Sequence, residues 1–415
     1  MKKDILILCQ YFYPEYVSSA TLPTDLAEDL VKKGLSVDVI CGVPKEYYDG
    51  EKVEKKEVYK GIGIHRVNYT EHNNKTKIGR IINFFSFFFS IVLKTPRMFK
   101  YKTIIVYSNP PILPLIPYII SLFTKTKYIF IAYDIYPDNA LLLGAISKGS
   151  IIEKTMKLIN KRVYTTASKV VVLGNEMKSY LIKNKIAINA ENLVIIPNWY
   201  NEIIENNIEI KNNEFLKIKE NRPFVVLYSG NMGPMQDIDT ILNAALNLKE
   251  NKNISFLFCG HGSKVQAIEK FIKENELDNC KLYGFLKGND YKEVLRISNL
   301  TIVSLEKGVE GIGVPSKTYG YFAAGKPVIA IMTDDTDIAN NLKEYNAGTN
   351  IHQGDVSMLV NLILEYQNNV QENNIRAINS KKLFNDLYRR ELCTEKYYEI
   401  INELIDDEKV KVGEY

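Results

Sequence analysis

The alternation of short apolar runs with helical patterns is the feature that most constrains the fold of this chain. Several of the runs are continuous stretches of Ile, Val and Leu, as expected for parallel strands buried on both faces of a sheet. In the first half we expect strands at 4–9, 36–41, 62–67, 103–107, 127–132, 169–173 and 193–197. Helical patterns lie between them, at 19–33, 78–99, 112–123, 150–166 and 175–184. Strand–helix alternation of this kind predicts an α/β fold with a doubly wound parallel sheet.

A polar segment near residue 200 divides this alternation into two halves. Residues 200–221 are rich in Asn, Glu, Ile and Lys and form the natural linker. Strand patterns then resume at 224–229, 254–258, 280–283, 300–304 and 327–331. A chain of 415 residues is too long for one ordinary core. The sequence therefore predicts one domain over 1–200, a second over 201–385, and a C-terminal helix over 386–415 that crosses back to the first domain.

Charge, cysteine content and the N-terminus exclude several classes of protein. The net charge of +4 and the lack of a long basic run predict no nucleic-acid partner. The five cysteines are isolated, without a CxxC pair, which is typical of reduced core residues in a cytosolic protein. The apolar run that begins at Ile5 is too short for an export signal. We therefore expect a cytoplasmic protein.

Three glycine-bearing turns in the second half follow predicted strands. Glycine lets a ligand approach the backbone, and free N–H groups at a helix start favour phosphate. The carboxyl ends of parallel strands meet at one edge, so these turns should converge on a nucleotide-diphosphate site. The candidate binding residues are Gly230, Asn231, Gly233, Gly260, His261, Lys264, Gly313, Val314, Pro315, Ser316 and Lys317. We expect Pro315 in the first helical turn, where its missing N–H costs nothing.

The first half has no glycine-rich turn after its first strand. The aromatic and mildly polar segment Cys9-Gln10-Tyr11-Phe12-Tyr13-Pro14-Glu15-Tyr16 follows instead. This asymmetry predicts that the first domain holds a different ligand. The chain also lacks GxxxxGK[ST], so ATP hydrolysis of the P-loop type is disfavoured.

Several motifs, in order, carry a resemblance to a known family. They are Tyr11-Phe12-Tyr13-Pro14-Glu15, Tyr133-Asp134-Ile135-Tyr136-Pro137-Asp138, Ile196-Pro197-Asn198-Trp199, Ser229-Gly230-Asn231-Met232-Gly233, Gly313-Val314-Pro315-Ser316-Lys317 and Ala323-Ala324-Gly325-Lys326-Pro327-Val328-Ile329-Ala330. Together they resemble retaining glycosyltransferases of family 4, in the bacterial branch similar to the N-acetyl-L-fucosamine transferases of O-antigen and capsule synthesis. The resemblance implies a glycosyltransferase-B fold, with two Rossmann-like domains facing across a cleft. It also implies a UDP-sugar on the second domain, an acceptor on the first, no required metal or other cofactor, and retention of anomeric configuration.

One position departs from the family pattern. The second acidic residue of the family, which holds the donor ribose, falls at Gly320 in this chain, while the first is matched by Glu310. Loss of a charged hydrogen bond costs about 1.5–3 kcal/mol, hence tenfold or more in donor affinity. Either another group holds the ribose or activity is reduced.

The same resemblance and elementary chemistry give candidate catalytic residues. A departing UDP gains negative charge in the transition state, so a fixed cation should face it. Lys317 is the first candidate and Lys264 the second, the alternative for each being a solvated lysine. Glu310 would contact the donor sugar or stabilise oxocarbenium-like charge, unless it is an ordinary loop carboxylate. Asp134 is a candidate base for the acceptor or partner of the donor sugar, and its alternative is a cap of the following turn.

Other polar residues have weaker functional interpretations. Asp138 shares the position and the capping alternative of Asp134, and His65 lies within a strand pattern as a half-buried histidine would. His261 is a candidate for contact with phosphate or uracil. Asp335-Thr336-Asp337 matches the metal-binding DxD pattern but follows a strand, where it equally suits a helix cap. We expect no metal.

An apolar segment at 81–93 contains five phenylalanines and is flanked by cations. As a helix it would reach roughly 20 Å, short of the roughly 30 Å hydrocarbon core of a bilayer. It is either a core helix or an interfacial helix on anionic lipid. We expect all five rings (Phe84, Phe85, Phe87, Phe88 and Phe89) to cover more than one face of such a helix. The flanking cations are Lys77, Arg80, Lys94, Arg97, Lys100 and Lys102.

The combined interpretation is a transferase at the inner face of the cell membrane. It would move a sugar, such as an N-acetylated deoxyhexose, from UDP to an undecaprenyl-diphosphate-linked saccharide in surface polysaccharide synthesis. Two alternatives stay open: a UDP-sugar 2-epimerase of the same fold, and an inactive donor-binding partner subunit. The sequence leaves open whether the chain forms a homo-oligomer.

Overall fold

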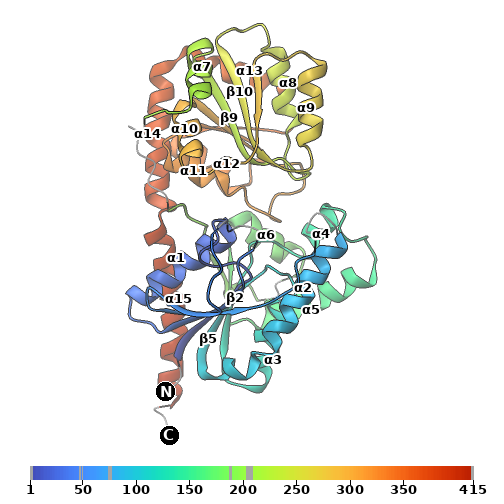
Figure 1. The fold of residues 1–415 in the computed structure, drawn as a ribbon, viewed down its shortest axis with the longest axis vertical. Helices are drawn as coiled ribbons and strands as arrows, with labels where there is room; N and C mark the ends of the chain where they lie inside the picture. Colours follow the sequence, from blue (N-terminus) through green and yellow to red (C-terminus); the bar gives the residue numbers. More distant parts are fainter. Residues whose placement is uncertain are drawn as a thin grey trace. The chain divides into compact units, whose positions relative to one another are not determined.

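The computed structural model describes residues 3–45, 48, 50–72, 77–186, 189–201 and 209–412. The chain divides into two compact units (Figure 1): unit 1 comprises Met1–Asn198 with Arg390–Tyr415, and unit 2 comprises Trp199–Arg389. The domain limits expected from the sequence were 200 and 385. Of the expected linker, 202–208 lies outside the described residues, and its end forms helix α7 (Asn213–Asn221).

Unit 1 is built on an eight-stranded sheet of order β3-β4-β2-β1-β5-β6-β7-β8. All neighbouring strands are parallel except β3 and β4. The strands are β1 (Lys3–Leu8), β2 (Val37–Gly42), β3 (Lys56–Tyr59), β4 (Ile62–Val67), β5 (Tyr101–Tyr107), β6 (Lys127–Ile131), β7 (Lys169–Val172) and β8 (Leu193–Ile195). Sequence patterning did not predict β3, because this short edge strand is not an apolar run.

The expected helices of unit 1 all form, but those predicted over 78–99 and 112–123 are shorter than expected, and the short helix at Asp138–Leu142 was not predicted. The helices are α1 (Ser18–Lys32), α2 (Lys77–Val92), α3 (Leu115–Phe123), α4 (Asp138–Leu142), α5 (Ile151–Thr166), α6 (Asn175–Lys183) and α15 (Arg390–Val412), with 3₁₀ turns η1 (Thr95–Lys100) and η2 (Ala190–Asn192). The helix expected over 78–99 ends at Val92 and is followed by η1, which has Pro96 at its start. Proline has no N–H for the α-helical ladder and disfavours α conformation in the residue before it.

Helix α15 belongs to unit 1, where it packs on α1 and β5. Arg390 at its start forms ion pairs with Asp25 (2.7 Å), Glu28 (3.2 Å) and Asp29 (2.7 Å) of α1. A buried guanidinium with several carboxylates around it satisfies its fixed fork of donors. The C-terminal segment is therefore a structural part of unit 1.

Unit 2 contains a six-stranded, wholly parallel sheet of order β11-β10-β9-β12-β13-β14. The strands are β9 (Phe224–Asn231), β10 (Ile254–His261), β11 (Cys280–Tyr283), β12 (Leu300–Ser304), β13 (Val328–Ile331) and β14 (Gly348–Ile351). The strand order reverses between β9 and β12. In open sheets of this kind, ligands bind beyond the carboxyl ends of the strands at such a switch point.

Helices cover both faces of this sheet, as the two apolar clusters on either side of it require. They are α7, α8 (Asp239–Asn247), α9 (Val265–Glu274), α10 (Asn289–Ile297), α11 (Lys317–Ala323), α12 (Asp337–Tyr345), α13 (Val356–Asn368) and α14 (Val370–Leu387). Along β9, Val225 and Leu227 enter one cluster while Val226 and Tyr228 enter the other. This alternation is the two-sided burial that the continuous apolar runs predicted.

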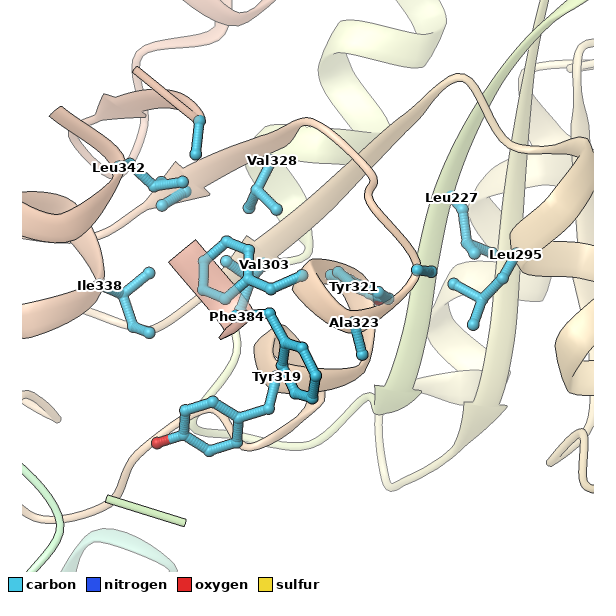
Figure 2. Close-up of a cluster of buried hydrophobic side chains, with 14 of the residues drawn as sticks. Leu227, Leu295, Val303, Tyr319, Tyr321, Ala323, Val328, Ile338, Leu342 and Phe384 are labelled. Carbon is cyan, nitrogen blue, oxygen red and sulfur yellow. The ribbon is translucent and has the colours of Figure 1, made fainter. Parts of the chain in front are cut away.

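The short helix α11 is buried in one of these clusters. Figure 2 shows Tyr319 and Tyr321 of α11 in the cluster that also contains Phe384. The Tyr321 hydroxyl accepts a hydrogen bond from the Ser229 amide (2.7 Å) and donates one to the Ser229 carbonyl (3.1 Å). Helix α11 is thereby fixed against the carboxyl end of β9.

No helix in the described ranges is both long enough and apolar enough to cross a bilayer.

Candidate nucleotide site

Strands β9 and β10 end side by side with a glycine in each. Gly230 pairs in register with Gly260, and Asn231 pairs with His261. A Cβ atom on Gly260, whose φ is +149°, would lie 1.9 Å from the Gly230 carbonyl oxygen. Only glycine fits this conformation and this approach. Two of the predicted turns therefore meet at one edge of the sheet, next to the switch point.

The Lys317 side chain lies over Gly230. A Cβ atom on Gly230 would lie 2.9 Å from Lys317 Cε and 3.2 Å from Nζ. The ammonium lies 3.8 Å from the centre of the Tyr228 ring and donates a hydrogen bond to the Tyr228 hydroxyl at 2.5 Å. The predicted binding residues Gly230 and Lys317, far apart in sequence, are thus in contact.

Lys317 has no counter-ion among the residues that the structure describes. Although the residue as a whole is only partly buried, protein atoms surround its ammonium, and this loss of water lowers the pKa of Lys317 from 10.5 to about 7. Among the residues that the structure describes, none forms an ion pair with it. An anion placed at this edge would restore the charge of the ammonium.

The turns after β9 and β10 are joined by backbone hydrogen bonds. The Met232 amide donates to the His261 carbonyl (2.7 Å), and the Lys264 amide donates to the Met232 carbonyl (2.9 Å). The Gln236 side-chain oxygen accepts from the Gly233 amide (3.0 Å) and from Asn231 Nδ2 (3.3 Å). The predicted residues Asn231 and Gly233 therefore shape a loop that Gln236 holds, a role that the sequence did not indicate.

Lys264 is held by the protein itself. Its ammonium forms a 2.8 Å ion pair with Glu306 and donates to the Gln236 carbonyl at 2.8 Å. A phosphate would have to compete with this carboxylate. Of the two predicted lysines, Lys317 is the one whose charge is left uncompensated.

His261 is exposed at the end of β10, beside an exposed aromatic residue. Its ring lies 5.6 Å from the ring of Phe285, at an interplanar angle of 69°. Phe285 follows β11 and was missed by sequence reasoning, although a Gly-Phe pair directly after a strand is a usable signal. The edge-to-face pair therefore presents aromatic surface at the same sheet edge as the glycine turns.

The third predicted turn leads into α11. Helix α11 begins at Lys317 with Ser316 at its N-cap position, so Pro315 lies just before the helix rather than in its first turn. The Pro315 carbonyl accepts hydrogen bonds from both the amide (3.1 Å) and the hydroxyl (2.8 Å) of Thr318. Ser316 is exposed, and Gly313 and Val314 are partly buried.

Glu310 is oriented by hydrogen bonds to both carboxylate oxygens. One oxygen accepts from the Gly308 amide (2.7 Å) and the other from Gln353 Nε2 (2.9 Å). Gln353 also donates to the Leu305 carbonyl (3.1 Å), which ties the loop after β14 to the loop after β12. Gln353 has no recognisable sequence signal, because its contacts with Glu310 and Leu305 join loops that are distant in sequence.

Gly320 is buried within α11, and aromatic groups fill the space beside it. A Cβ atom at this position would lie 3.1 Å from the Tyr291 hydroxyl and 3.4 Å from Cε2 of Tyr200. An acidic side chain at 320 would require both tyrosines to move. These tyrosines are the groups that lie where the family pattern places a carboxylate.

The predicted residues of unit 1 form a separate group after β6. Asp134 Oδ1 accepts a hydrogen bond from Asn139 Nδ2 (2.8 Å), and burial raises the pKa of Asp134 from 3.8 to about 6. Asp138 is the first residue of α4, and its Oδ1 accepts from the Tyr180 hydroxyl (3.0 Å). A carboxyl group with its pKa near 6 is suited to general acid–base work near neutral pH.

Two weaker candidates have structural roles. His65 lies in β4, as its strand pattern predicted, and burial lowers its pKa. In the DxD-like segment, the Thr336 hydroxyl caps α12 by accepting from the Ala339 amide (3.3 Å). The described residues contain no group of His, Cys, Asp and Glu side chains arranged to hold a metal ion.

The chain is similar in sequence to known glycosyltransferases. Residues 209–383 match the model of the family "Glycosyl transferases group 1". The chain is 28% identical over 334 residues to the probable glycosyltransferase WbjE of Pseudomonas aeruginosa, covering 79% of this chain and 80% of the relative. It is 24% identical over 240 residues to the chitobiosyldiphosphodolichol beta-mannosyltransferase of Candida albicans, covering 55% and 52% of the two chains.

Solved structures match nearly the whole chain. Anabaena HepE in complex with UDP superposes with a TM-score of 0.71 at 14% sequence identity, covering 96% of this chain and 100% of that one. The likeness confirms the expected glycosyltransferase-B fold with two Rossmann-like domains.

Proposed function

We propose that this chain, a glycosyltransferase, transfers a sugar from UDP to a lipid-linked saccharide. Its residues 209–383 match the glycosyl transferases group 1 family. The sugar is an N-acetylated deoxyhexose or a related residue, the lipid is undecaprenyl diphosphate, and the product enters surface polysaccharide. Anomeric configuration is retained, and no metal takes part. The donor occupies the glycine turns of unit 2, and the acceptor binds unit 1.

The observation that carries the donor assignment is Lys317 over Gly230 at the switch point of the unit 2 sheet. A lysine with a pKa of about 7 and no ion-pair partner in the described part of the chain gains most when a diphosphate supplies the missing charge. The adjoining glycine backbone lets the diphosphate approach closely. HepE, whose structure contains UDP, supports the nature of the donor.

The assignment of a lipid-linked acceptor has a different support. The mannosyltransferase relative is named for a chitobiosyl group on diphosphodolichol, a lipid diphosphate. Asp134, with its raised pKa, is the group of unit 1 that we assign to the acceptor hydroxyl. Glu310, held by Gln353 and the Gly308 amide, faces the donor sugar in this proposal.

In the reaction, the bond between the sugar and the UDP oxygen breaks while the acceptor oxygen bonds to the same carbon. Lys317 and nearby N–H groups stabilise the charge on the departing diphosphate. The acceptor hydroxyl loses its proton, and in this proposal the Asp134 carboxylate accepts it. Because its partner Tyr228 is uncharged, no neighbouring carboxylate among the described residues weakens the attraction between the Lys317 ammonium and the diphosphate.

Titration calorimetry of the full chain with UDP tests the donor site. Lys317→Met should weaken UDP binding by about tenfold to a hundredfold, the value of one charged hydrogen bond. Lys307→Met is the matched control, since Lys307 is an exposed lysine in the loop before Glu310, and it should leave the affinity unchanged. Equal affinity in all three proteins would refute the assignment of Lys317.

Mass spectrometry of reactions with UDP-sugars and an undecaprenyl-diphosphate-linked acceptor tests the transfer itself. A product heavier by one sugar is expected, and NMR of its anomeric proton reports retention. UDP binding without any product would favour the inactive partner subunit. An altered UDP-sugar without transfer would favour the epimerase.

A further inference from the structure

Large apolar side chains are exposed along one part of unit 1. Most of the exposed large apolar residues in the described ranges lie between Ile78 and Leu158. They include Phe89 of α2 (60% exposed), Leu93 after it (80%), Phe123 of α3 (82%) and Ile151 of α5 (83%). We call the exposed surface of α2, η1, α3 and α5 the apolar face of unit 1. Surface patches of this extent usually mark an interaction site.

Helix α2 separates its phenylalanines between the core and this face. Phe87 is fully buried and Phe88 is only 9% exposed, whereas Phe85 and Phe89 are exposed with their rings stacked at 6.4 Å. The core interpretation of segment 81–93 therefore holds for Phe87 and Phe88, while Phe85 and Phe89 are left at the surface. The rings available for contact on this helix are therefore the pair at i and i+4, Phe85 and Phe89.

The helices of the apolar face are neighbours in space. The 3₁₀ turn η1 follows α2 directly in the chain, and α3 contacts both η1 and α5. In unit 1 the strand order reverses between β1 and β5, so right-handed crossovers place α3 and α5 on the face of the sheet opposite α1. Figure 1 shows α2, α3 and α5 together on one side of the unit 1 sheet.

The same part of the chain carries a strong positive charge. Residues 77–165 contain 13 Lys and Arg against 3 Asp and Glu, a net charge of +10, so the rest of the chain carries −6 to give the total of +4. Arg97, Lys125, Lys154, Lys161 and Arg162 of this segment are exposed. Clustered cations beside exposed aromatic side chains fit a surface with anionic headgroups over an apolar layer.

We propose that the apolar face of unit 1 docks in the plane of an anionic lipid bilayer. Phe85, Phe89 and Phe123 insert at the boundary between headgroups and acyl chains, and the exposed cations of η1 and α5 contact the anionic headgroups. The surface is thus a composite of several helices rather than the single segment 81–93. Docking goes beyond sugar transfer, because it requires neither a donor nor an acceptor.

Co-sedimentation of the full chain with vesicles tests the proposal. Binding is expected to vesicles of phosphatidylcholine mixed with phosphatidylglycerol, to be weaker with phosphatidylcholine alone, and to fall with added salt. Phe89→Ser with Phe123→Ser should lower the partition coefficient at least about tenfold, since each ring loses its apolar burial. Lys154→Gln with Lys161→Gln should lower it by about tenfold on anionic vesicles only.

Ile375→Ser with Ile378→Ser is the matched control. Both residues are exposed apolar side chains on α14 of unit 2, so their loss should leave vesicle binding unchanged. Circular dichroism and UDP affinity should be the same in every variant, which separates a failure of docking from a failure of the donor site.

Two outcomes would overturn the proposal. One is a wild-type protein that stays in the supernatant with anionic vesicles at low salt. The other is sedimentation velocity showing that the same phenylalanine changes dissociate a dimer while vesicle binding is unaffected, in which case a second copy of the chain covers the face.

Discussion

Both units are built on a sheet of mainly parallel strands, but the carboxyl ends of the inner strands differ between them. In unit 2, the backbones of Gly230 and Gly260 meet at the carboxyl edge, and the three atoms nearest to a Cβ atom on Gly230 all belong to the flexible Lys317 side chain. In unit 1, Gly42 ends β2, but a Cβ atom there would lie 2.6 Å from the Tyr69 ring and 2.9 Å from the Gln10 carbonyl oxygen. The unit 1 glycine is therefore covered by protein.

The lysines at the two sheet edges also differ in whether a carboxylate pairs with them. Lys45 of unit 1 lies 4.1 Å from the centre of the Tyr69 ring, much as Lys317 lies on Tyr228, but Lys45 also forms a 2.9 Å ion pair with Glu71. Lys317 has no such carboxylate among the described residues. Both sheets thus have an edge at which their parallel strands end. The unpaired lysine and the closely approached glycine backbone make the edge of unit 2 the better site for an anion.

The largest expected effect concerns how each unit is completed. Unit 2 is one continuous stretch of chain, whereas unit 1 needs α15, held by Arg390 on Asp25, Glu28 and Asp29. Arg390→Met should destabilise the protein by about 3–5 kcal/mol, because buried carboxylates lose their partner. Urea unfolding followed by circular dichroism measures this.

Arg389→Met is the neighbouring control, since the exposed Arg389 side chain donates to the Asn385 carbonyl. A loss of stability as large for Arg389→Met as for Arg390→Met would show that the ion-pair cluster is not what anchors α15.

The second prediction tests the glycine edge of unit 2. Gly260→Ala forces a Cβ atom into a φ of +149° and against the Gly230 carbonyl. We expect a loss of about 1–3 kcal/mol in folding free energy from backbone strain, with loss of UDP binding. Thermal unfolding with and without UDP measures both effects.

Gly284→Ala provides the contrast, because a Cβ atom there would meet nothing within 4 Å. If Gly260→Ala were as stable and bound UDP as well as Gly284→Ala, the close approach of β9 and β10 would not matter for the donor.

Burial on both faces made most of this fold predictable from the sequence. The central strands are apolar runs because both sheet faces are covered, but the edge strands Lys56–Tyr59 and Gly348–Ile351 were missed because neither is an apolar run. The glycine turns could be recognised from the sequence, because their local backbone geometry requires glycine. Phe285 was missed although a Gly-Phe pair follows its strand, whereas Gln353 and Tyr291 could not be recognised, since their positions depend on how segments distant in sequence pack.

The third prediction concerns pH and the uncompensated lysine of unit 2. The pKa of Lys317 is lowered from 10.5 to about 7 in the folded protein, and a bound diphosphate raises it again. UDP binding above about pH 7 should therefore take up a proton, so affinity falls as pH rises. Calorimetry in buffers of different ionisation enthalpy detects the uptake, which Lys317→Met should abolish.

Folding stability should respond with the opposite sign. The unfolded chain binds more protons at Lys317 between about pH 7 and 10.5, so this residue makes stability rise with pH across that window. The unfolding free energy of the wild type should thus rise relative to that of Lys317→Met as the pH rises. A constant difference would mean that the ammonium is well solvated.

The smallest expected effect concerns Gly320. Addition of an acid at this position, from the family pattern alone, should tighten UDP binding, but Tyr291 and Tyr200 occupy the space within 3.1 Å and 3.4 Å of the new Cβ atom. We expect Gly320→Glu to leave UDP affinity unchanged or weaker and to cost about 1–3 kcal/mol through overpacking.

Gly320→Ala separates the clash of one carbon from that of a carboxylate, and the added helix propensity of alanine partly offsets it. Combining Gly320→Glu with Tyr291→Ala removes the hydroxyl nearest to the new side chain, so affinity should rise above that of Gly320→Glu alone. Tighter binding by the single variant, measured by calorimetry in a folded protein, would mean that the two tyrosines yield readily and that the ribose lies within reach of position 320.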